Sequence, residues 1–134
     1  MSTTTDTTAG TVASDFDGLA ERYIAAWNET DPDARAQAVA ALYAEDARYT
    51  DPMVDAEGRE AIAATIGAVQ QQFPGFAFRL AGPVDAYHDQ LRFTWELGPD
   101  GQEAPVAGFD VVVLDGAGRI RTVLGFLDRV PAAV

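Results

Sequence analysis

The residue whose chemistry stands out first in the sequence is Asp110, an acid in the middle of the apolar run at residues 106–114. If this run is a β-strand, Asp110 points to the same face as Gly108 and Val112. A carboxylate on a buried strand face loses hydration at a cost of several kcal/mol, unless its pKa rises and it stays protonated. Such an acid is typical of a functional site, although an exposed strand edge or a satisfied structural carboxyl gives the same pattern.

Two further residues carry groups that could act with this acid. Asp51 precedes Pro52 directly after a short apolar-alternating segment at residues 47–50, where an Asp is either a turn former or a catalytic base. Tyr23 lies on the apolar stripe of an amphipathic segment, where it is either a core residue or a buried hydroxyl that needs a hydrogen-bond partner. Tyr49 is interpreted as a core or pocket-wall residue.

The remaining polar candidates are His88 and Arg92. His88 is the only histidine and follows Tyr87 at an expected turn between two strands, which favours an exposed position over a catalytic one. Arg92 shares a strand face with Thr94, and we interpret it as an ion-pair or dimer-interface residue rather than an anion-binding one.

Composition narrows the functional classes. The chain has 134 residues and a net charge of −12, which argues against nucleic acid and anionic membrane surfaces as partners. It contains no Cys and one His, so disulfides, thiolate nucleophiles and multi-histidine metal sites are not expected. No phosphate loop, dinucleotide fingerprint or zinc signature occurs, and no cofactor or metal is expected. Asp and Tyr remain as the available chemistry, and they suit proton transfer.

The elements that must position these residues follow from hydrophobic periodicity. Helical spacing predicts helices from Ser14, from Asp31-Pro32 and from Gly58, with a short strand at residues 47–50 between the second and third. Period-two alternation then predicts four strands at residues 76–80, 91–97, 107–114 and 119–128. The result is an α+β protein with one domain at residues 14–134, preceded by a disordered, Thr-rich tail at residues 1–13. Neither a targeting signal nor a membrane helix is apparent, so a cytoplasmic location is expected.

In this order and spacing the chain resembles the ketosteroid isomerase and SnoaL-like polyketide cyclase branch of the nuclear transport factor 2-like superfamily. The resemblance covers roughly residues 15–130. The motifs that carry it are Arg22-Tyr23-Ile24, Leu42-Tyr43-Ala44-Glu45-Asp46-Ala47, Asp51-Pro52, Gly58-Arg59-Glu60-Ala61-Ile62, Gly82-Pro83-Val84, Phe109-Asp110-Val111 and Gly118-Arg119-Ile120.

The resemblance implies a fold and a set of roles. The fold is a cone, in which a curved antiparallel sheet packs on three N-terminal helices (a cystatin-like α+β roll), with one deep apolar pocket per subunit of a homodimer. In the isomerases a Tyr on the first helix and a protonated Asp on a late strand form the oxyanion hole, and an Asp after the first strand is the base. Tyr23, Asp110 and Asp51 match these positions. The residues expected to line the pocket are Trp27, Tyr43, Ile66, Phe76, Phe78, Trp95 and Phe126.

The chain also departs from the family pattern. Ile66 stands where the isomerases have a second, supporting Tyr on the third helix, while Tyr43 matches the other Tyr of their network. The loop between Asp51 and Gly58 is shorter than in the isomerases. The Arg-x-Asp pattern of the limonene epoxide hydrolases is Arg92-Phe93-Thr94 here, which argues against epoxide opening.

The expected function is cofactor-independent proton transfer next to the carbonyl of a hydrophobic small molecule, through a dienolate as in allylic isomerisation of a ketosteroid. Three alternatives stay open at this point. One is aldol-type ring closure of a polyketide, which uses the same enolate intermediate. Another is a non-catalytic module of the same fold that binds a small molecule. The third is a purely structural dimer with a filled core, which would have no pocket.

Overall fold

The computed structural model describes residues 2–131 of the chain, with side chains from residue 15 onward. Its helices are α1 (Ser2–Asn28), α2 (Pro32–Leu42) and α3 (Arg59–Gln72). Helix α2 begins as its sequence predicts, because Asp31 Oδ2 accepts a hydrogen bond from Ala34 N at 2.8 Å and Pro32 occupies the first turn. Helix α3 follows Gly58, whose φ of 92° lies in the left-handed region that favours glycine.

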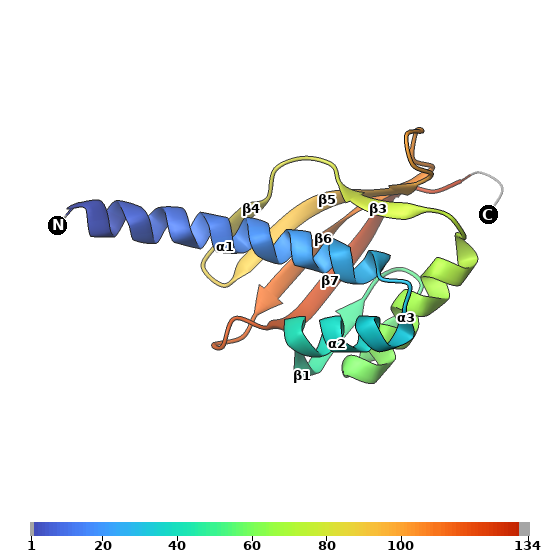
Figure 1. The fold of residues 1–134 in the computed structure, drawn as a ribbon, viewed down its shortest axis with the longest axis horizontal. Helices are drawn as coiled ribbons and strands as arrows, with labels where there is room; N and C mark the ends of the chain where they lie inside the picture. Colours follow the sequence, from blue (N-terminus) through green and yellow to red (C-terminus); the bar gives the residue numbers. More distant parts are fainter. Residues whose placement is uncertain (1, 132–134) are drawn as a thin grey trace.

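The strands form one curved sheet that packs against the helices (Figure 1). Their order within the described residues is β2-β1-β7-β6-β5-β3, and β4 also pairs with β5. Their bounds are β1 (Tyr43–Thr50), β2 (Asp55–Glu57), β3 (Ala77–Leu80), β4 (Asp85–Tyr87), β5 (Gln90–Gly98), β6 (Val106–Leu114) and β7 (Ile120–Arg129). The α+β roll predicted from the sequence is therefore confirmed.

The sheet is mixed, which corrects the expectation that it is antiparallel throughout. Strand β1 runs parallel to β7, with Tyr49 opposite Val123 and Thr50 opposite Leu124. The other pairings are antiparallel. Parallel neighbours need a long connection, and here everything from β2 to β6 separates β1 from β7, so local patterning could not reveal the pair. Strands β2 and β4 were also missed, because three residues are too few to show an alternation.

Helix α1 begins earlier than the sequence predicts. Its backbone is helical from Ser2, and Figure 1 shows its N-terminal part (blue) extending beyond the sheet. The predicted disordered tail at residues 1–13 falls on residues whose side chains lie outside the described part of the chain, so it stays a prediction. No helix among the described residues is long and apolar enough to cross a membrane.

Side-chain hydrogen bonds to the backbone fix α1 against the sheet and against α3. Asn28, at the end of α1, pairs with Phe78 as a strand residue does: its Nδ2 donates to Phe78 O at 2.9 Å, and its Oδ1 accepts from Phe78 N at 2.7 Å. Gln70 of α3 donates to the backbone oxygens of Trp27 and Glu29 at 2.9 and 2.8 Å. These bonds satisfy carbonyl groups at the helix end and hold the inner face of α1 over β3.

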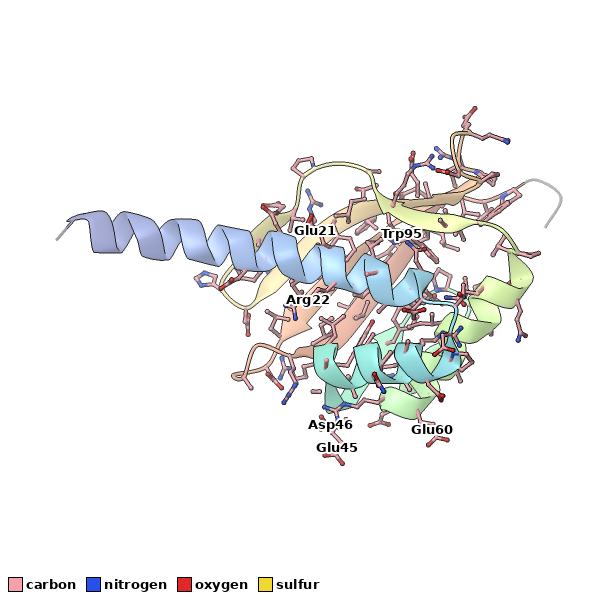
Figure 2. The ribbon with its side chains drawn as sticks, viewed as in Figure 1. Glu21, Arg22, Glu45, Asp46, Glu60 and Trp95 are labelled. Carbon is pink, nitrogen blue, oxygen red and sulfur yellow. The ribbon has the colours of Figure 1, made fainter. Side chains whose placement is uncertain are left out.

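The core lies between the helices and the concave face of the sheet. On β6 alternate residues from Val106 to Val112 are buried, as the sequence pattern predicts. Charged residues such as Glu45, Asp46 and Glu60 are exposed, and Figure 2 shows them pointing away from the protein. Among the described residues, Asp110 is the single charged side chain that is buried.

Candidate active site

An apolar cavity of about 270 Å³ lies between the helices and the sheet. Its walls come from the inner face of α1, the segment after β1, one face of α3, and strands β3, β5, β6 and β7. Asp51 and Asp110 are its acidic lining residues, and no Arg or His of the described chain lines it. The cavity therefore holds two carboxyl groups without a cationic counter-charge.

Asp110 lies at the inner wall of the cavity, 3% exposed, with both of its oxygens hydrogen-bonded. Trp95 Nε1 donates to Asp110 Oδ1 at 3.0 Å, and Tyr23 Oη donates to Oδ2 at 2.5 Å. Burial raises the pKa of Asp110 from 3.8 to about 6; the two hydrogen bonds oppose this rise, and the charge of Asp51 adds to it. Asp110 can thus hold a proton at a pH where ordinary carboxyl groups are ionised.

Tyr23 remains a hydroxyl donor in this environment. It lies on the inner face of α1, where its ring packs edge-on against Phe93 with a centroid distance of 5.1 Å. Burial, together with the charge of Asp110, raises the pKa of the Tyr23 hydroxyl well above its usual value. Tyr23 is therefore more than a core residue, because its hydroxyl donates a hydrogen bond to a specific acid.

Asp51 lies directly after β1 and is held by three donors. Its Oδ1 accepts hydrogen bonds from Met53 N at 2.8 Å and Val54 N at 2.9 Å, which makes it the turn former that the Asp-Pro sequence predicts. Its Oδ2 accepts a hydrogen bond from Tyr49 Oη at 2.6 Å. With its turn fixed by these three hydrogen bonds, Asp51 also lines the cavity. The turn-former and functional interpretations are therefore compatible.

Gly125 of β7 lets the two carboxyl groups approach each other. It pairs directly with Asp110 across β6 and β7, and it is buried. A Cβ atom at this position would lie 3.0 Å from Asp110 Oδ1 and 3.2 Å from Asp51 Cβ. The space that a side chain would fill is thus the space between the two acids.

The predicted pocket residues fall into two groups. Trp27, Phe78, Trp95 and Phe126 line the cavity, and Figure 2 labels Trp95 on the sheet. Three others do not belong to its lining, and the prediction is corrected for them: Tyr43, Ile66 and Phe76. The reasons are how deeply each of these side chains is buried and which residues lie next to it. Tyr43 and Ile66 are fully buried in the core behind the lining, and Phe76 stacks on Phe73, which occupies the wall instead.

The tyrosine network of the isomerases is also different here. Tyr43 Oη has no hydrogen-bond partner among the described residues, although its ring centroid lies 6.3 Å from that of Tyr23. Ile66 supplies no hydroxyl. The Tyr23 hydroxyl is therefore supported by Asp110, and not by a second tyrosine.

Two polar contacts of the site were not anticipated from the sequence. Tyr49 was interpreted as core or pocket wall, yet its hydroxyl binds Asp51; the signal was available, because residues two apart on a strand share a face. Trp95 was expected to line the pocket, but its hydrogen bond to Asp110 depends on the β5–β6 register, which pairs Trp95 with Gly108. The loop between these strands is too long to fix that register from the sequence.

His88 and Arg92 lie away from the cavity. His88 is exposed at the turn between β4 and β5, with a φ of 58°, as predicted. Arg92 is exposed and pairs with Asp85 across β4 and β5, with 3.6 Å between Arg92 Nε and Asp85 Oδ2, which agrees with the ion-pair interpretation. Across the described chain, no group of three His, Cys, Asp or Glu side chains is arranged to hold a metal ion.

The fold and the cavity define a class of protein: an α+β roll whose helices and curved sheet enclose one acidic, apolar pocket. The sequence matches the family model of the SnoaL-like domain over residues 20–123, which is most of the chain. The protein therefore belongs to the SnoaL-like family of the nuclear transport factor 2-like superfamily, as its resemblance suggested.

Solved structures agree with this assignment. A SnoaL-like family protein from Agrobacterium tumefaciens, named as a candidate isomerase, is 43% identical, with a TM-score of 0.82 over 86% of this chain and 98% of that one. A candidate polyketide cyclase from Sinorhizobium meliloti is 18% identical, with a TM-score of 0.66 over 84% of this chain and 97% of that one. A SnoaL-like protein from Burkholderia thailandensis is also 18% identical, with a TM-score of 0.68 over 85% and 95% of the two chains. The latter two show the fold alone. A comparison with curated proteins finds no match.

Proposed function

We propose that this protein is a cofactor-independent enzyme that moves a proton next to the carbonyl of a hydrophobic small molecule. Asp51 takes the proton from the carbon beside the carbonyl, and Tyr23 and protonated Asp110 stabilise the negative charge that develops on the carbonyl oxygen. With a β,γ-unsaturated ketone the intermediate is a dienolate. Protonated Asp51 then returns the proton to the γ-carbon, which gives the conjugated ketone and regenerates the base.

One observation carries this proposal: the two acids lie against Gly125 in different surroundings, Asp51 in a hydrogen-bonded turn and Asp110 buried on β6. Asp51 accepts hydrogen bonds from two backbone amides and a phenol at the edge of the cavity. Burial raises the pKa of Asp110, which favours its neutral form. A pair of carboxyl groups whose environments differ in this way is suited to act as a base and an acid in one reaction.

Protonation of Asp110 changes what Tyr23 can do. In the structure Tyr23 donates its hydrogen to Asp110 Oδ2. When Asp110 carries a proton, its own O–H can donate to Tyr23 Oη, and the phenolic hydrogen is then free for a substrate oxygen. A hydroxyl that accepts one strong hydrogen bond donates more strongly to the next partner. The pair therefore supports stabilisation of an oxyanion in an apolar cavity.

The substrate of this reaction is a neutral carbonyl compound. The cavity offers apolar and aromatic walls and no cationic residue of the described chain, so a carboxylate or phosphate on the substrate would find no counter-charge beside the two acids. The name of the Agrobacterium relative supports isomerisation, at 43% identity. Ring closure of a polyketide uses the same enolate, but the relative named for it shares only the fold.

The test is turnover of a β,γ-unsaturated ketosteroid, followed by the absorbance of the conjugated enone. The Asp51→Asn variant keeps the shape of the turn and removes the base, and its rate should fall by about 10²- to 10⁴-fold. Asp46→Asn is the matched control, because Asp46 is an exposed acid on the same strand and lies outside the cavity. Its rate should equal that of the wild type.

Other outcomes separate the alternatives. Equal rates in the wild type and Asp51→Asn contradict a role for Asp51 as the base. If the wild type shows no turnover but binds the steroid, and Asp51→Asn binds it with the same affinity, a non-catalytic binding role is favoured. Slow ring closure of a linear β-diketone, abolished in Asp51→Asn, favours the cyclase reaction instead.

A further inference from the structure

Trp95 and Tyr23 contact different oxygens of the Asp110 carboxyl group. The Trp95 indole Nε1 lies 3.0 Å from Asp110 Oδ1, while Tyr23 Oη lies 2.5 Å from Oδ2. Both contacts are buried, so water does not compete with them. The two oxygens of this carboxyl group therefore face partners of different chemistry.

The indole N–H donates hydrogen bonds and cannot accept them. A proton on Asp110 Oδ1 would leave the indole N–H facing a hydroxyl oxygen, which accepts a hydrogen bond more weakly than a carbonyl oxygen does. The contact with Trp95 therefore favours Oδ1 as the carbonyl acceptor and Oδ2 as the oxygen that carries the proton. There it meets the Tyr23 hydroxyl, which can both accept and donate.

The position of the Trp95 ring is itself fixed by the sheet. Trp95 pairs with Gly108 across β5 and β6, and a Cβ atom at position 108 would lie 2.8 Å from Trp95 Cζ2. Phe78 also packs edge-on with the Trp95 ring, with a centroid distance of 5.4 Å. The ring lies over the glycine, and its Nε1 reaches Asp110, two residues farther along β6.

We propose that Trp95 is a positioning residue that keeps the acid proton of Asp110 on Oδ2, beside Tyr23. This inference rests on the proposed function, in which that proton supports the oxyanion. Without the indole donor the proton distributes between two oxygens, and the carboxyl group is free to turn. Part of the protein then holds its proton away from Tyr23.

The same hydrogen bond affects the titration of Asp110. The titratable groups that face Asp110 are Tyr23 from α1, Tyr43 and Tyr49 from β1, and Asp51 from the segment after it. None of them is a cation. Trp95 and Tyr23 are the two side chains that lower the pKa of Asp110, against the effect of burial. Removal of the indole N–H should therefore raise this pKa.

The test is the titration of the Asp110 carboxyl carbon, followed by ¹³C NMR on protein labelled at Asp. In Trp95→Phe, which keeps an aromatic ring and removes the donor, the midpoint should move upward by about one pH unit. Trp27→Phe is the matched control: Trp27 is the other indole of the cavity, and its Nε1 has no hydrogen-bond partner within the described residues. Its midpoint should stay that of the wild type.

The wild-type protein gives a second readout that needs no variant. The indole N–H resonance of Trp95 should titrate with the same midpoint as Asp110, while that of Trp27 should not. This readout covers the case in which Trp95→Phe fails to fold. An unshifted midpoint in folded Trp95→Phe, or a Trp95 indole resonance that ignores the titration of Asp110, overturns the proposal.

Kinetics then separate positioning from damage to the cavity. At a pH where Asp110 is protonated in both proteins, kcat of Trp95→Phe should be several-fold lower than that of the wild type, with KM little changed. In both proteins kcat should fall as the pH rises, and in Trp95→Phe this fall should occur at a higher pH. The two pH profiles of kcat should therefore converge or cross. A uniform loss at every pH indicates structural damage and contradicts the proposal. The NMR result stands even if no substrate is turned over, so failure of the proposed function is recognised separately.

Discussion

Asp110 and Gly125 are paired directly across β6 and β7, and a side chain at Gly125 would press on both Asp110 and Asp51. The glycine is buried, and its φ does not lie in the left-handed region. Backbone conformation therefore does not require glycine here; the close approach of the two acids does. Three elements meet at this point: β6 carries Asp110, β7 carries Gly125, and the segment after β1 carries Asp51.

Gly125→Ala should separate the two acids while the fold is kept. The added Cβ would lie 3.0 Å from Asp110 Oδ1 and 3.2 Å from Asp51 Cβ, so at least one carboxyl group must move. The shift needed is a few tenths of an ångström, and because a misplacement of about 1 Å costs roughly 100-fold, kcat should fall several-fold. Circular dichroism and steady-state kinetics check the two parts of the prediction.

Gly116→Ala is the control for this substitution. Gly116 lies in the exposed turn between β6 and β7, and a Cβ there meets no atom within 4 Å. Its kcat should equal that of the wild type. Unchanged kcat in Gly125→Ala would mean that the spacing of the acids does not matter to the reaction.

Tyr23→Phe should lose most of the stabilisation of the oxyanion. Removal of one donor of this kind lowers kcat by about 10²- to 10³-fold, with a smaller effect on KM. Tyr43→Phe is a close control, because Tyr43 is also fully buried but its hydroxyl has no partner among the described residues. Steady-state kinetics on both variants measure the loss of kcat. An equal loss of kcat in the two variants would contradict the role assigned to Tyr23.

Asp110 should make the protein less stable as the pH rises. Its pKa is about 6 in the folded protein, whereas an Asp freely exposed to water has a pKa of 3.8, so between these values the folded state holds a proton that the unfolded state has lost. The stability from this proton is full below pH 3.8 and disappears as the pH rises through 6. The difference is about 3 kcal/mol in the free energy of unfolding.

Urea unfolding of the wild type and Asp110→Asn at several pH values measures this effect. The free energy of unfolding of the wild type should fall relative to that of Asp110→Asn between about pH 4 and pH 7. Asp55 acts in the opposite direction: Arg48 lowers its pKa to about 2, so its contribution is present above pH 3.8 and lost as the pH falls through 2. Asp55→Asn should therefore leave the slope over the higher range unchanged. Parallel curves for the wild type and Asp110→Asn would show that Asp110 is not perturbed.

Removal of residues 1–13 should leave stability and turnover unchanged. This segment contains six Thr and no aromatic residue, and Thr is a weak helix former. The residues of α1 that contact the cavity begin only at Tyr23. Thermal unfolding and steady-state kinetics of the shortened chain test the prediction, and a measurable fall in Tm would show that the segment belongs to the domain.

Periodicity in the sequence predicts most of this fold because each element has one buried face. The stripe that contains Tyr23 and the alternation around Asp110 both lie where they were expected, since burial of apolar side chains determines those faces. Periodicity does not predict which strands pair when they are far apart in the sequence. The parallel contact of β1 with β7 depends on the whole chain between them, and the predicted homodimer stays a prediction.

The candidate site was predictable in its acids and not in the residues that support them. Asp110 is conspicuous because a carboxyl group is costly on an apolar strand face. Tyr49 and Trp95 are ordinary aromatic residues in the sequence, and their hydrogen bonds depend on the turn at Asp51 and on the β5–β6 register. Tyr43 and Ile66 were placed in the pocket by family position, whereas their depth in the core decides otherwise.

The most direct test of the account is deuterium exchange from D₂O into the carbon next to the carbonyl of a small bicyclic ketone such as 2-tetralone, followed by proton NMR. This exchange reports the removal of the proton by Asp51, which isomerisation and ring closure share. Exchange should be faster with the wild-type protein than without it, and Asp51→Asn should return it to the uncatalysed rate. Exchange at the uncatalysed rate with the wild type, while the ketone binds in the cavity, would contradict proton transfer as the function of this site.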